Sequence, residues 1–447
     1  MTSHWSLFTI LSSLILLSAC SEREDGTSSN SQEVLSFSAN VQTAEQTRAY
    51  TGTIDNLAVL KALDDGFGVF AYLTESSLWD AVKTTATPDF MYNQSVYWGV
   101  QYLDGSTPQY DWVYTPLKYW PNYSNNDNAH PRYVSFFAYA PFTAEGATSG
   151  IAGFPDNTDK SPHVTYQIGP IDGAITDAQV SGHSDLMYAS CTNARRNDKG
   201  LIEVVSSTNT YQKVPLTFHH ALSCVDVYVQ RVYNEEAFSG NKPAAETNTK
   251  LFISKLQLVA GSAMTTKGDL SLLDGSWSNT AGTTTISFSE TEFAESIRGT
   301  ANTGSSDLDK AIVRDSELDK WGKENFGIDE RERSLFTGAK SMMMIPQTVT
   351  FTPVVTYSMI TRDNSLDTGY LVDKDDNRYS RIVNTVSGNP VTLTFTKGKR
   401  YTLLIHIGVE TVEFEVVSIE DWDFPIRFNT DVDDNEKETI EKIVNES

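Results

Sequence analysis

Short stretches of alternating or aromatic residues, separated by Gly, Pro, Asn and Asp, run along almost the whole chain. Alternation with a period of two is typical of a half-buried β-strand, whereas an amphipathic helix needs a period near 3.6 residues. Hardly any stretch shows the helical period. We therefore predict an all-β fold. The clearest predicted strands are LSFSANV near residue 35, GFGVFAYL near 68, YVSFFAYAPF near 133, PLTFHHALSCVDVYVQ near 215, KLFISKLQLV near 250, VTLTFTKG near 391, YTLLIHIGV near 401 and TVEFEVVSI near 411.

This number of strands is enough for two β-sandwiches in tandem. The segment 234–249, NEEAFSGNKPAAETNT, combines charge with Pro, Gly and Asn, which is typical of a connector between domains. We therefore predict an N-terminal sandwich over 49–235 and a C-terminal sandwich over 246–429.

Two segments depart from the strand pattern. Residues 290–336 are rich in charge and Ser, with possible short helices over 308–319, and are predicted to form a long insertion on the second domain. Residues 430–447 form an acidic tail. We expect neither segment to belong to the core.

The N-terminus carries an apolar run from Leu7 to Leu17 that is about half the roughly 20 residues needed to cross a bilayer as a helix. Its length and position indicate a signal peptide over 1–19, although no Lys or Arg precedes it. The sequence Leu-Ser-Ala-Cys ending at Cys20 resembles a bacterial lipobox, which predicts lipidation of Cys20. The alternative is a buried cysteine that ends a short core helix. The acidic cluster that follows Cys20 resembles a surface-export tag, or is a solvated linker.

The charge balance excludes one class of partner. The chain has 58 Asp plus Glu against 34 Lys plus Arg, a formal net charge of −24. Such a surface repels phosphate backbones, so we expect no nucleic-acid partner. After Cys20 only Cys191 and Cys224 remain. Secretion permits a disulfide between them, and the sequence leaves their pairing open.

No motif predicts catalysis, a metal or a cofactor. His219 and His220 are adjacent in a predicted strand, so their rings point to opposite faces and cannot bind one metal together. The acidic run from Asp431 begins like an EF-hand loop, but Glu436 and Lys442 occupy the positions that need Gly and a bidentate Glu. We therefore predict that the chain is not an enzyme and needs no cofactor.

Aromatic residues are densest over 90–124. They could form a platform on which sugar rings stack, or they could fill a sandwich core and cross-strand pairs, which is the interpretation we favour. The residues are Tyr92, Tyr97, Trp98, Tyr102, Tyr110, Trp112, Tyr114, Tyr119, Trp120 and Tyr123.

A series of blocks resembles the fimbrillin family of Bacteroidales, the subunits of type V pili. After the lipobox these are EQTRAY, GFGVFAYL, YTPLKYWPN, VSFFAYAPF, VPLTFHHALSCVDV, TKGDLSLLDGSW, MMMIPQ and VEFEVVSIEDW, in family order over nearly the whole chain. Two features depart from the family pattern: Cys224, where Lys is common, and the insertion over 290–336. The position of the subunit in a fibre stays open.

The resemblance implies two transthyretin-like β-sandwich domains in tandem, exported as a lipoprotein that is anchored in the outer membrane by its lipid. It also implies an Arg-specific protease that cuts between Arg48 and Ala49 and removes the propeptide over 20–48 with its first strand. The implied partners are other pilus subunits, reached through strand exchange, and host or bacterial surface ligands. The implied location is the cell surface, in a fimbria.

The residues themselves support a removable strand. Leu35, Phe37, Ala39 and Val41 alternate with polar residues, as in a half-buried strand. Removing such a strand leaves an apolar groove beside unpaired backbone groups, and a strand from a neighbouring subunit can fill it by β-augmentation.

Two C-terminal segments alternate in the same way and are candidate donors. We favour the later segment, because Pro425 cannot donate a ladder hydrogen bond and therefore suits a strand paired well on one side only. The candidate donor residues are Phe424, Ile426 and Phe428 in the later segment and Val412, Phe414 and Val416 in the earlier one.

The sequence therefore favours a structural subunit of a pilus that polymerises by protease-triggered strand exchange and supports adhesion. The alternative is a monomeric surface lipoprotein that binds glycans through residues 90–124. A fibre subunit should lose its lipid together with residues 20–48, whereas a glycan receptor should keep it. A secreted hydrolase is a third and weaker interpretation.

Overall fold

The computed structural model describes most of the chain between residues 33 and 422, in the following ranges: 33–42, 53–102, 108–121, 132–146, 150–169, 180–197, 199–232, 248–289, 291–299, 318–322, 326–408 and 411–422. The helices described are short: α1 (Leu57–Lys61), α2 (Trp79–Val82) and two 3₁₀ turns, Val180–Gly182 and Thr337–Ala339. In the described ranges no helix is both long and apolar enough to cross a membrane. The prediction of an all-β fold is confirmed.

A nine-stranded sheet contains the first strand of the chain. Its strands follow the order β1-β11-β8-β5-β2-β3-β4, with β9 paired to β8 and β10 to β9. The pairing of β1 with β11 is parallel, and the other pairings are antiparallel. The strands are β1 (Phe37–Val41), β2 (Phe67–Glu75), β3 (Met91–Tyr102), β4 (Pro108–Val113), β5 (Tyr133–Ala140), β8 (Met187–Arg196), β9 (Ile202–Val204), β10 (Thr210–Tyr211) and β11 (Val214–His220).

An eight-stranded antiparallel sheet is built on β13, the longest of the described strands. Its order is β18-β19-β17-β13-β7-β6, with β14 paired to β13 and β20 to β17. The strands are β6 (Ile151–Gly153), β7 (His163–Gln167), β13 (Thr249–Ser271), β14 (Trp277–Ser289), β17 (Gln347–Arg362), β18 (Leu371–Val372), β19 (Arg378–Ser387) and β20 (Val391–Phe395).

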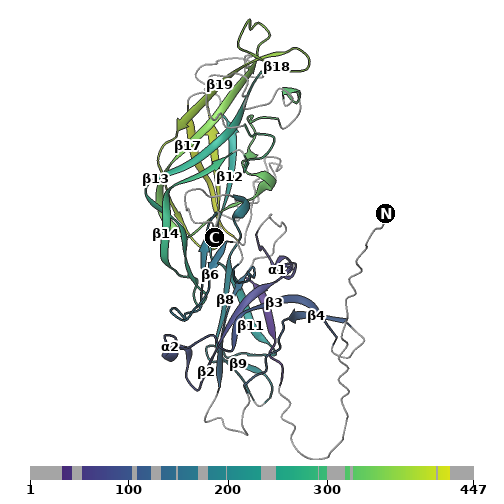
Figure 1. The fold of residues 1–447 in the computed structure, drawn as a ribbon, viewed down its shortest axis with the longest axis vertical. Coiled ribbons are helices and arrows are strands. Elements are labelled where there is room, and N and C mark those ends of the chain that lie inside the picture. Colours follow the sequence, from purple (N-terminus) through teal and green to yellow (C-terminus); the bar gives the residue numbers. More distant parts are fainter. Residues whose placement is uncertain are drawn as a thin grey trace, which may run out of the picture.

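A five-stranded sheet completes the fold, in the order β15-β12-β21-β22 with β16 paired to β12. Its strands are β12 (Ser223–Arg231), β15 (Arg333–Ser334), β16 (Met342–Met344), β21 (Lys399–Ile407) and β22 (Val412–Asp421). In Figure 1 the molecule is elongated, with β2, β8 and β11 in its lower part and β13, β17 and β19 in its upper part.

The core divides at β2, which is buried on both faces. Val69 and Ala71 belong to a cluster inside the nine-stranded sheet. Phe70 and Tyr72 face the opposite way, into a larger cluster that continues between the five-stranded and eight-stranded sheets. Side chains alternate along a strand, so a continuous apolar run such as GFGVFAYL serves both clusters at once.

The sheets do not separate at the connector over 234–249. β7 and β12 come before it in the chain, yet β7 pairs with β13 and β12 pairs with β15, β16 and β21, which all come after it. β12 lies parallel to β21 over eight residue pairs, from Cys224 with Arg400 to Arg231 with Ile407. Hydrogen-bonded pairing therefore crosses between the two halves of the sequence. The domain limits given above remain a prediction.

The prediction that residues 290–336 lie outside the core is wrong for the part of this segment that the structure describes. Phe293, Ile297 and Phe336 are at most 1% exposed and belong to the large cluster. Leu318 and Trp321 are buried in a smaller cluster with residues of β13, β17 and β19. The segment is rich in charge, but its spaced apolar residues anchor it. The predicted helices over 308–319 fall largely outside the described residues, as does the acidic tail.

Candidate functional site: the first strand and its neighbours

β1 lies at one end of the nine-stranded sheet, with alternate side chains facing the core. Leu35 and Phe37 are fully buried, while Ala39 and Val41 are 9% and 3% exposed. Ser38 and Asn40 are exposed. The strand that the alternation predicts is therefore present, with its apolar face inward.

The neighbour on one side of β1 is β11. Phe37, Ala39 and Val41 lie beside Val214, Leu216 and Phe218 in parallel register. Backbone bonds hold both ends of this ladder: the Val214 amide donates to the Ser36 carbonyl at 2.9 Å, and the Gln42 amide to the Phe218 carbonyl at 2.9 Å.

The neighbour on the other side is the segment that follows β4. The Leu35 amide donates to the Lys118 carbonyl at 2.9 Å, and the Trp120 amide donates to the Glu33 carbonyl at 3.1 Å. An antiparallel bridge joins Val34 to Tyr119 between these bonds. Residues 33–42 therefore join β11 to the segment 118–120, which follows β4, the strand at the other end of the sheet.

Aromatic rings surround Phe37 in the core. The centroid of its ring lies 5.6 Å from that of Phe136, 5.8 Å from that of Tyr114 and 6.4 Å from that of Phe67, each in an edge-to-face arrangement. Such pairs stabilise beyond the area that they bury. Phe37 is thus the central side chain of the contact between β1 and the sheet.

Tyr114 ties the backbone of this segment to the core. Its hydroxyl donates a hydrogen bond of 2.7 Å to the Leu35 carbonyl. Burial raises the pKa of Tyr114 to about 12, so the hydroxyl stays protonated as a donor at neutral pH. At the surface, Glu33 forms an ion pair with Arg196 of β8. An exposed pair of this kind contributes little stability.

Of the two candidate donor segments, the earlier one is β22, a strand of the chain's own sheet. β22 pairs with β21 from Val412 to Asp421 and ends the five-stranded sheet. Val412 is 4% exposed, whereas Phe414 and Val416 are half-buried against the large core cluster. The later donor segment, Phe424, Ile426 and Phe428, lies outside the described residues, as do Cys20, Arg48 and Ala49.

The residues that follow the predicted cleavage site meet the end of the last strand. The indole Nε1 of Trp422 donates to the Asp55 carboxylate at 3.1 Å. The Trp422 ring stacks on His220 with centroids 3.9 Å apart and planes 5° apart. The Asp185 carboxylate accepts the Ile54 amide at 2.8 Å and lies 3.1 Å from Nδ1 of His220. This buried junction places the two ends of the described chain beyond Arg48 side by side.

The aromatic stretch over 90–124 divides between core and surface. Trp112, Tyr114 and Trp120 are at most 6% exposed, as the core interpretation predicts. Tyr97 and Tyr110, however, are 41% and 64% exposed, because the hairpin of β3 and β4 extends past the body of the sheet. The side chains of Tyr102 and Tyr123 lie outside the described residues.

The two histidines and two cysteines discussed above are packed within the fold. His220 is buried and His219 is half-buried, on opposite faces of β11 as expected. Cys191 and Cys224 are free thiols in different core clusters, and burial raises the pKa of each to about 12. Among the described residues no group of three His, Cys, Asp or Glu side chains could hold a metal ion.

Comparison with known proteins gives consistent matches along the chain. A family model described as fimbrillin-like matches residues 47–422. The fimbrium subunit Fim1C of Phocaeicola vulgatus is 24% identical over 434 residues, which cover 93% of this chain and 96% of that protein. The crystal structure of a fimbrial protein from Bacteroides vulgatus superposes with a TM-score of 0.53 at 21% identity, covering 87% of this chain and 99% of that one. This last likeness concerns the fold alone.

Proposed function

Because this chain belongs to the fimbrillin-like family, we propose that it is a structural subunit of a cell-surface fimbria that polymerises by strand exchange and supports adhesion. The precursor is exported as a lipoprotein that carries its lipid on Cys20. An Arg-specific protease then cuts after Arg48, and residues 20–48 leave together with β1. A strand from a neighbouring subunit takes the vacated place.

The observation that carries this proposal is the position of β1. Residues 33–42 supply four inward side chains and hydrogen-bond to β11 on one side and to the segment 118–120 on the other. Full burial of a Leu, Phe or Val side chain is worth about 1.5–3 kcal/mol. A subunit that loses β1 therefore exposes an apolar groove lined by backbone groups without partners, which a strand of another subunit can fill.

The cleavage step is tested with Arg48→Ala in the native cell. We expect the variant to remain a folded, lipidated monomer, because the groove stays filled by β1. N-terminal sequencing should find Ala49 as the first residue of wild-type fibres.

The matched control is Arg23→Ala, which removes another arginine of the same propeptide. This variant should be cut after Arg48 and should form fibres as the wild type does. Fibres that assemble from the Arg48→Ala protein would show that the cleavage site or the mechanism is wrong.

The donor is proposed to lie beyond Trp422, in Phe424, Ile426 and Phe428. β22 is the weaker candidate, because its donation would strip β21 of a partner along its whole length. Deleting residues 424–447, or replacing the three apolar residues with Ser, should leave the melting temperature of the monomer unchanged and abolish fibres.

The control for this deletion removes only the acidic tail, residues 430–447, and should still assemble. If both donor variants lower the melting temperature of the monomer, the segment belongs to its own domain. The donor would then have to lie elsewhere.

The exposed rings of Tyr92, Tyr97, Tyr110 and Tyr119 favour the alternative, a monomeric glycan-binding lipoprotein. In that case the mature surface protein would retain Cys20 with its lipid. The same N-terminal sequencing therefore separates the two functions.

A further inference from the structure

The last apolar segment of the chain repeats the sequence pattern of the first strand. Residues 35–41 read LSFSANV, and residues 426–432 read IRFNTDV. Both segments have a branched aliphatic residue first, Phe third, a small residue fifth and Val seventh. Alternate side chains of a strand face the same way, so as strands the two segments would present nearly the same four side chains in the same order.

The four sites that the first segment fills differ in size and depth. Leu35 and Phe37 are fully buried, and the Phe37 ring lies among three other aromatic rings. Val41 lies beside Phe218 and is 3% exposed. Ala39 fills its site with a single methyl group and is 9% exposed, the most of the four. An incoming strand therefore needs two large apolar residues, then a small one, then one of medium size.

One register of the C-terminal segment matches this order. It places Ile426 at the site of Leu35, Phe428 at that of Phe37, Thr430 at that of Ala39 and Val432 at that of Val41. A shift of two residues one way puts Phe428 at the Ala39 site, where a ring in place of a methyl group overpacks the core. A shift of two the other way puts Thr430 at the Phe37 site and leaves a cavity. A shift of one turns the apolar residues outward.

Pro425 suits the same register. It falls at the position of Val34, which is 38% exposed and bridges to Tyr119. The two hydrogen bonds of that bridge come from the amides of Leu35 and Trp120, and the Val34 amide takes no part in them. A proline at this position therefore costs the strand neither of these bonds.

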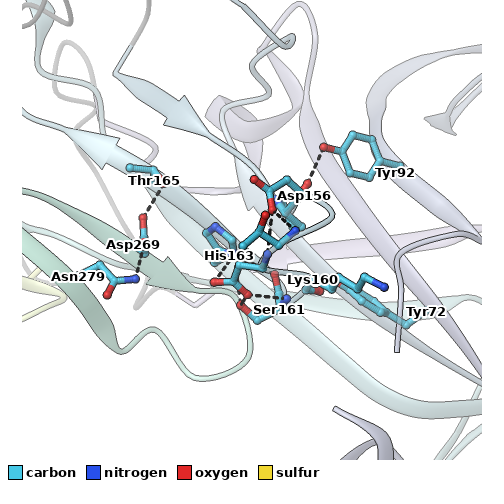
Figure 2. A network of polar contacts seen from close by, with 12 residues as sticks. Tyr72, Tyr92, Asp156, Lys160, Ser161, His163, Thr165, Asp269 and Asn279 are labelled. Atoms are coloured by element: carbon cyan, nitrogen blue, oxygen red, sulfur yellow. Dashed lines mark hydrogen bonds and ion pairs between the residues drawn. The ribbon is translucent and has the colours of Figure 1, made fainter. Parts of the chain in front are cut away.

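The wall of the groove formed by β2 is held by a contact outside the groove. Val69 and Ala71 belong to the cluster that β1 covers, while Tyr72 points the other way. The Tyr72 hydroxyl donates to the Lys160 carbonyl at 2.7 Å (Figure 2). This bond does not involve residues 33–42, so it does not depend on β1. A groove that keeps its shape costs less entropy to fill.

We propose that the groove binds residues 426–432 of a second copy of this chain, parallel to β11 and in the register of β1. This inference rests on the strand exchange proposed above, and it adds the register and the identity of the partner. Groove and matching segment belong to one sequence, so copies of this chain extend a fibre without another kind of subunit. The chain is then a repeating subunit, and its donor reaches past Phe428 into the acidic tail.

The register is tested by cysteine cross-linking in fibres from the native cell. In the proposed register Asp431 takes the place of Asn40, beside Thr217 of the second copy, and both positions face outward. Cα atoms of adjacent strands are about 5 Å apart, which a disulfide can span. After mild oxidation, fibres of Thr217→Cys/Asp431→Cys should give a ladder of linked chains on non-reducing gels, and reduction should return monomers.

The matched control is Thr217→Cys/Asn429→Cys. Its second cysteine would lie two residues along the strand, about 8 Å away, which is too far for a disulfide. Adding Arg48→Ala to the first pair should also prevent the ladder, because β1 then stays in the groove. The register is overturned if the Asn429 pair cross-links instead, or if neither pair does in fibres that assemble. A disulfide within single chains would overturn the second copy as the partner.

A second pair of variants decides the register if the cysteine variants do not assemble. Thr430→Trp places a large ring at the Ala39 site and should lower the yield of fibres about tenfold or more. Asn429→Trp points outward and should assemble as the wild type does. Equal yields from these two variants would overturn the register.

The deletion of residues 430–447 keeps Ile426 and Phe428 for the two deepest sites. Its fibres should therefore form, but dissociate in detergent at a lower temperature than wild-type fibres. Equal resistance would show that the donor ends at Phe428. If wild-type cells carry no fibres that contain this chain, the proposed function itself is wrong and the register fails with it.

Discussion

β1 and β22 are both terminal strands of their sheets, and both alternate apolar with polar residues, yet they are held differently. β1 and the residues just before it, 33–42 together, bury all four of their inward side chains and have hydrogen-bonded neighbours on two sides. β22 pairs with β21 alone among the described strands, and only Val412 of its apolar residues is fully buried. Val417 and Ile419 of β22 are 46% and 56% exposed.

This difference shows that an alternating sequence pattern does not indicate how much a strand contributes to the stability of the folded subunit. β1 lies between two hydrogen-bonded neighbours, so it covers the core beneath it. β22 lies at a sheet edge with one described neighbour, so much of its apolar surface stays exposed. Substitutions in each strand test this difference, with stability measured on the uncut monomer by chemical denaturation.

The largest effect is expected for Phe37→Ala. Removing this ring leaves a cavity among Phe67, Tyr114 and Phe136, and we expect the free energy of unfolding to fall by about 3–5 kcal/mol. The matched change in β22 is Phe414→Ala, which removes an edge-to-face contact with Phe351 at 5.7 Å. It should cost about 1–2 kcal/mol. Equal losses in the two strands would refute the comparison.

An intermediate effect is expected for Tyr114→Phe, which keeps the ring but removes the hydrogen bond to the Leu35 carbonyl. The expected loss is about 0.5–1.5 kcal/mol. Tyr110→Phe removes a hydroxyl from a side chain that is 64% exposed, and should change stability by no more than about 0.5 kcal/mol. If both substitutions are neutral, the hydroxyl of Tyr114 does not help to hold the first strand.

The smallest effect is expected for Ile419→Ser on the open face of β22. The side chain is more than half exposed, so the free energy of unfolding should change by no more than about 0.5 kcal/mol. Val412→Ser, at the buried start of the same strand, should cost more, because it places a hydroxyl in the core. A large loss for Ile419→Ser would mean that this face is covered in the monomer.

Much of the fold could be predicted from local pattern. The period of two located β11, β12 and β22, because burial of one face selects apolar residues at alternate positions. The same argument located the four inward residues of the segment 35–41, which contains β1. His219 and His220 were assigned to opposite faces correctly for the same reason. Continuous apolar and aromatic runs located β2 and β5, which are buried on both faces.

Partners distant in sequence could not be predicted. Nothing local specifies that β1 runs parallel to β11, or that residues 118–120 bond to residues 33–35 across about 80 positions of chain. The block YTPLKYWPN drew attention to Tyr114 as a family feature, but not to its bond with Leu35. Residues 290–336 were predicted to lie outside the core because the segment is rich in charge. Its few apolar residues, such as Phe293, are nevertheless buried, and their spacing gave no period that would indicate this.

Trp422 is the last described residue before the proposed donor segment, and one buried junction with Asp55 and His220 holds its side chain. In a fibre joined by strand exchange, tension enters a subunit through the strand that it donates and through the groove that it offers. Tension on the donor would therefore reach Trp422 first, and its hydrogen bond to Asp55 and its stacking on His220 would resist that tension before β22 separates from β21.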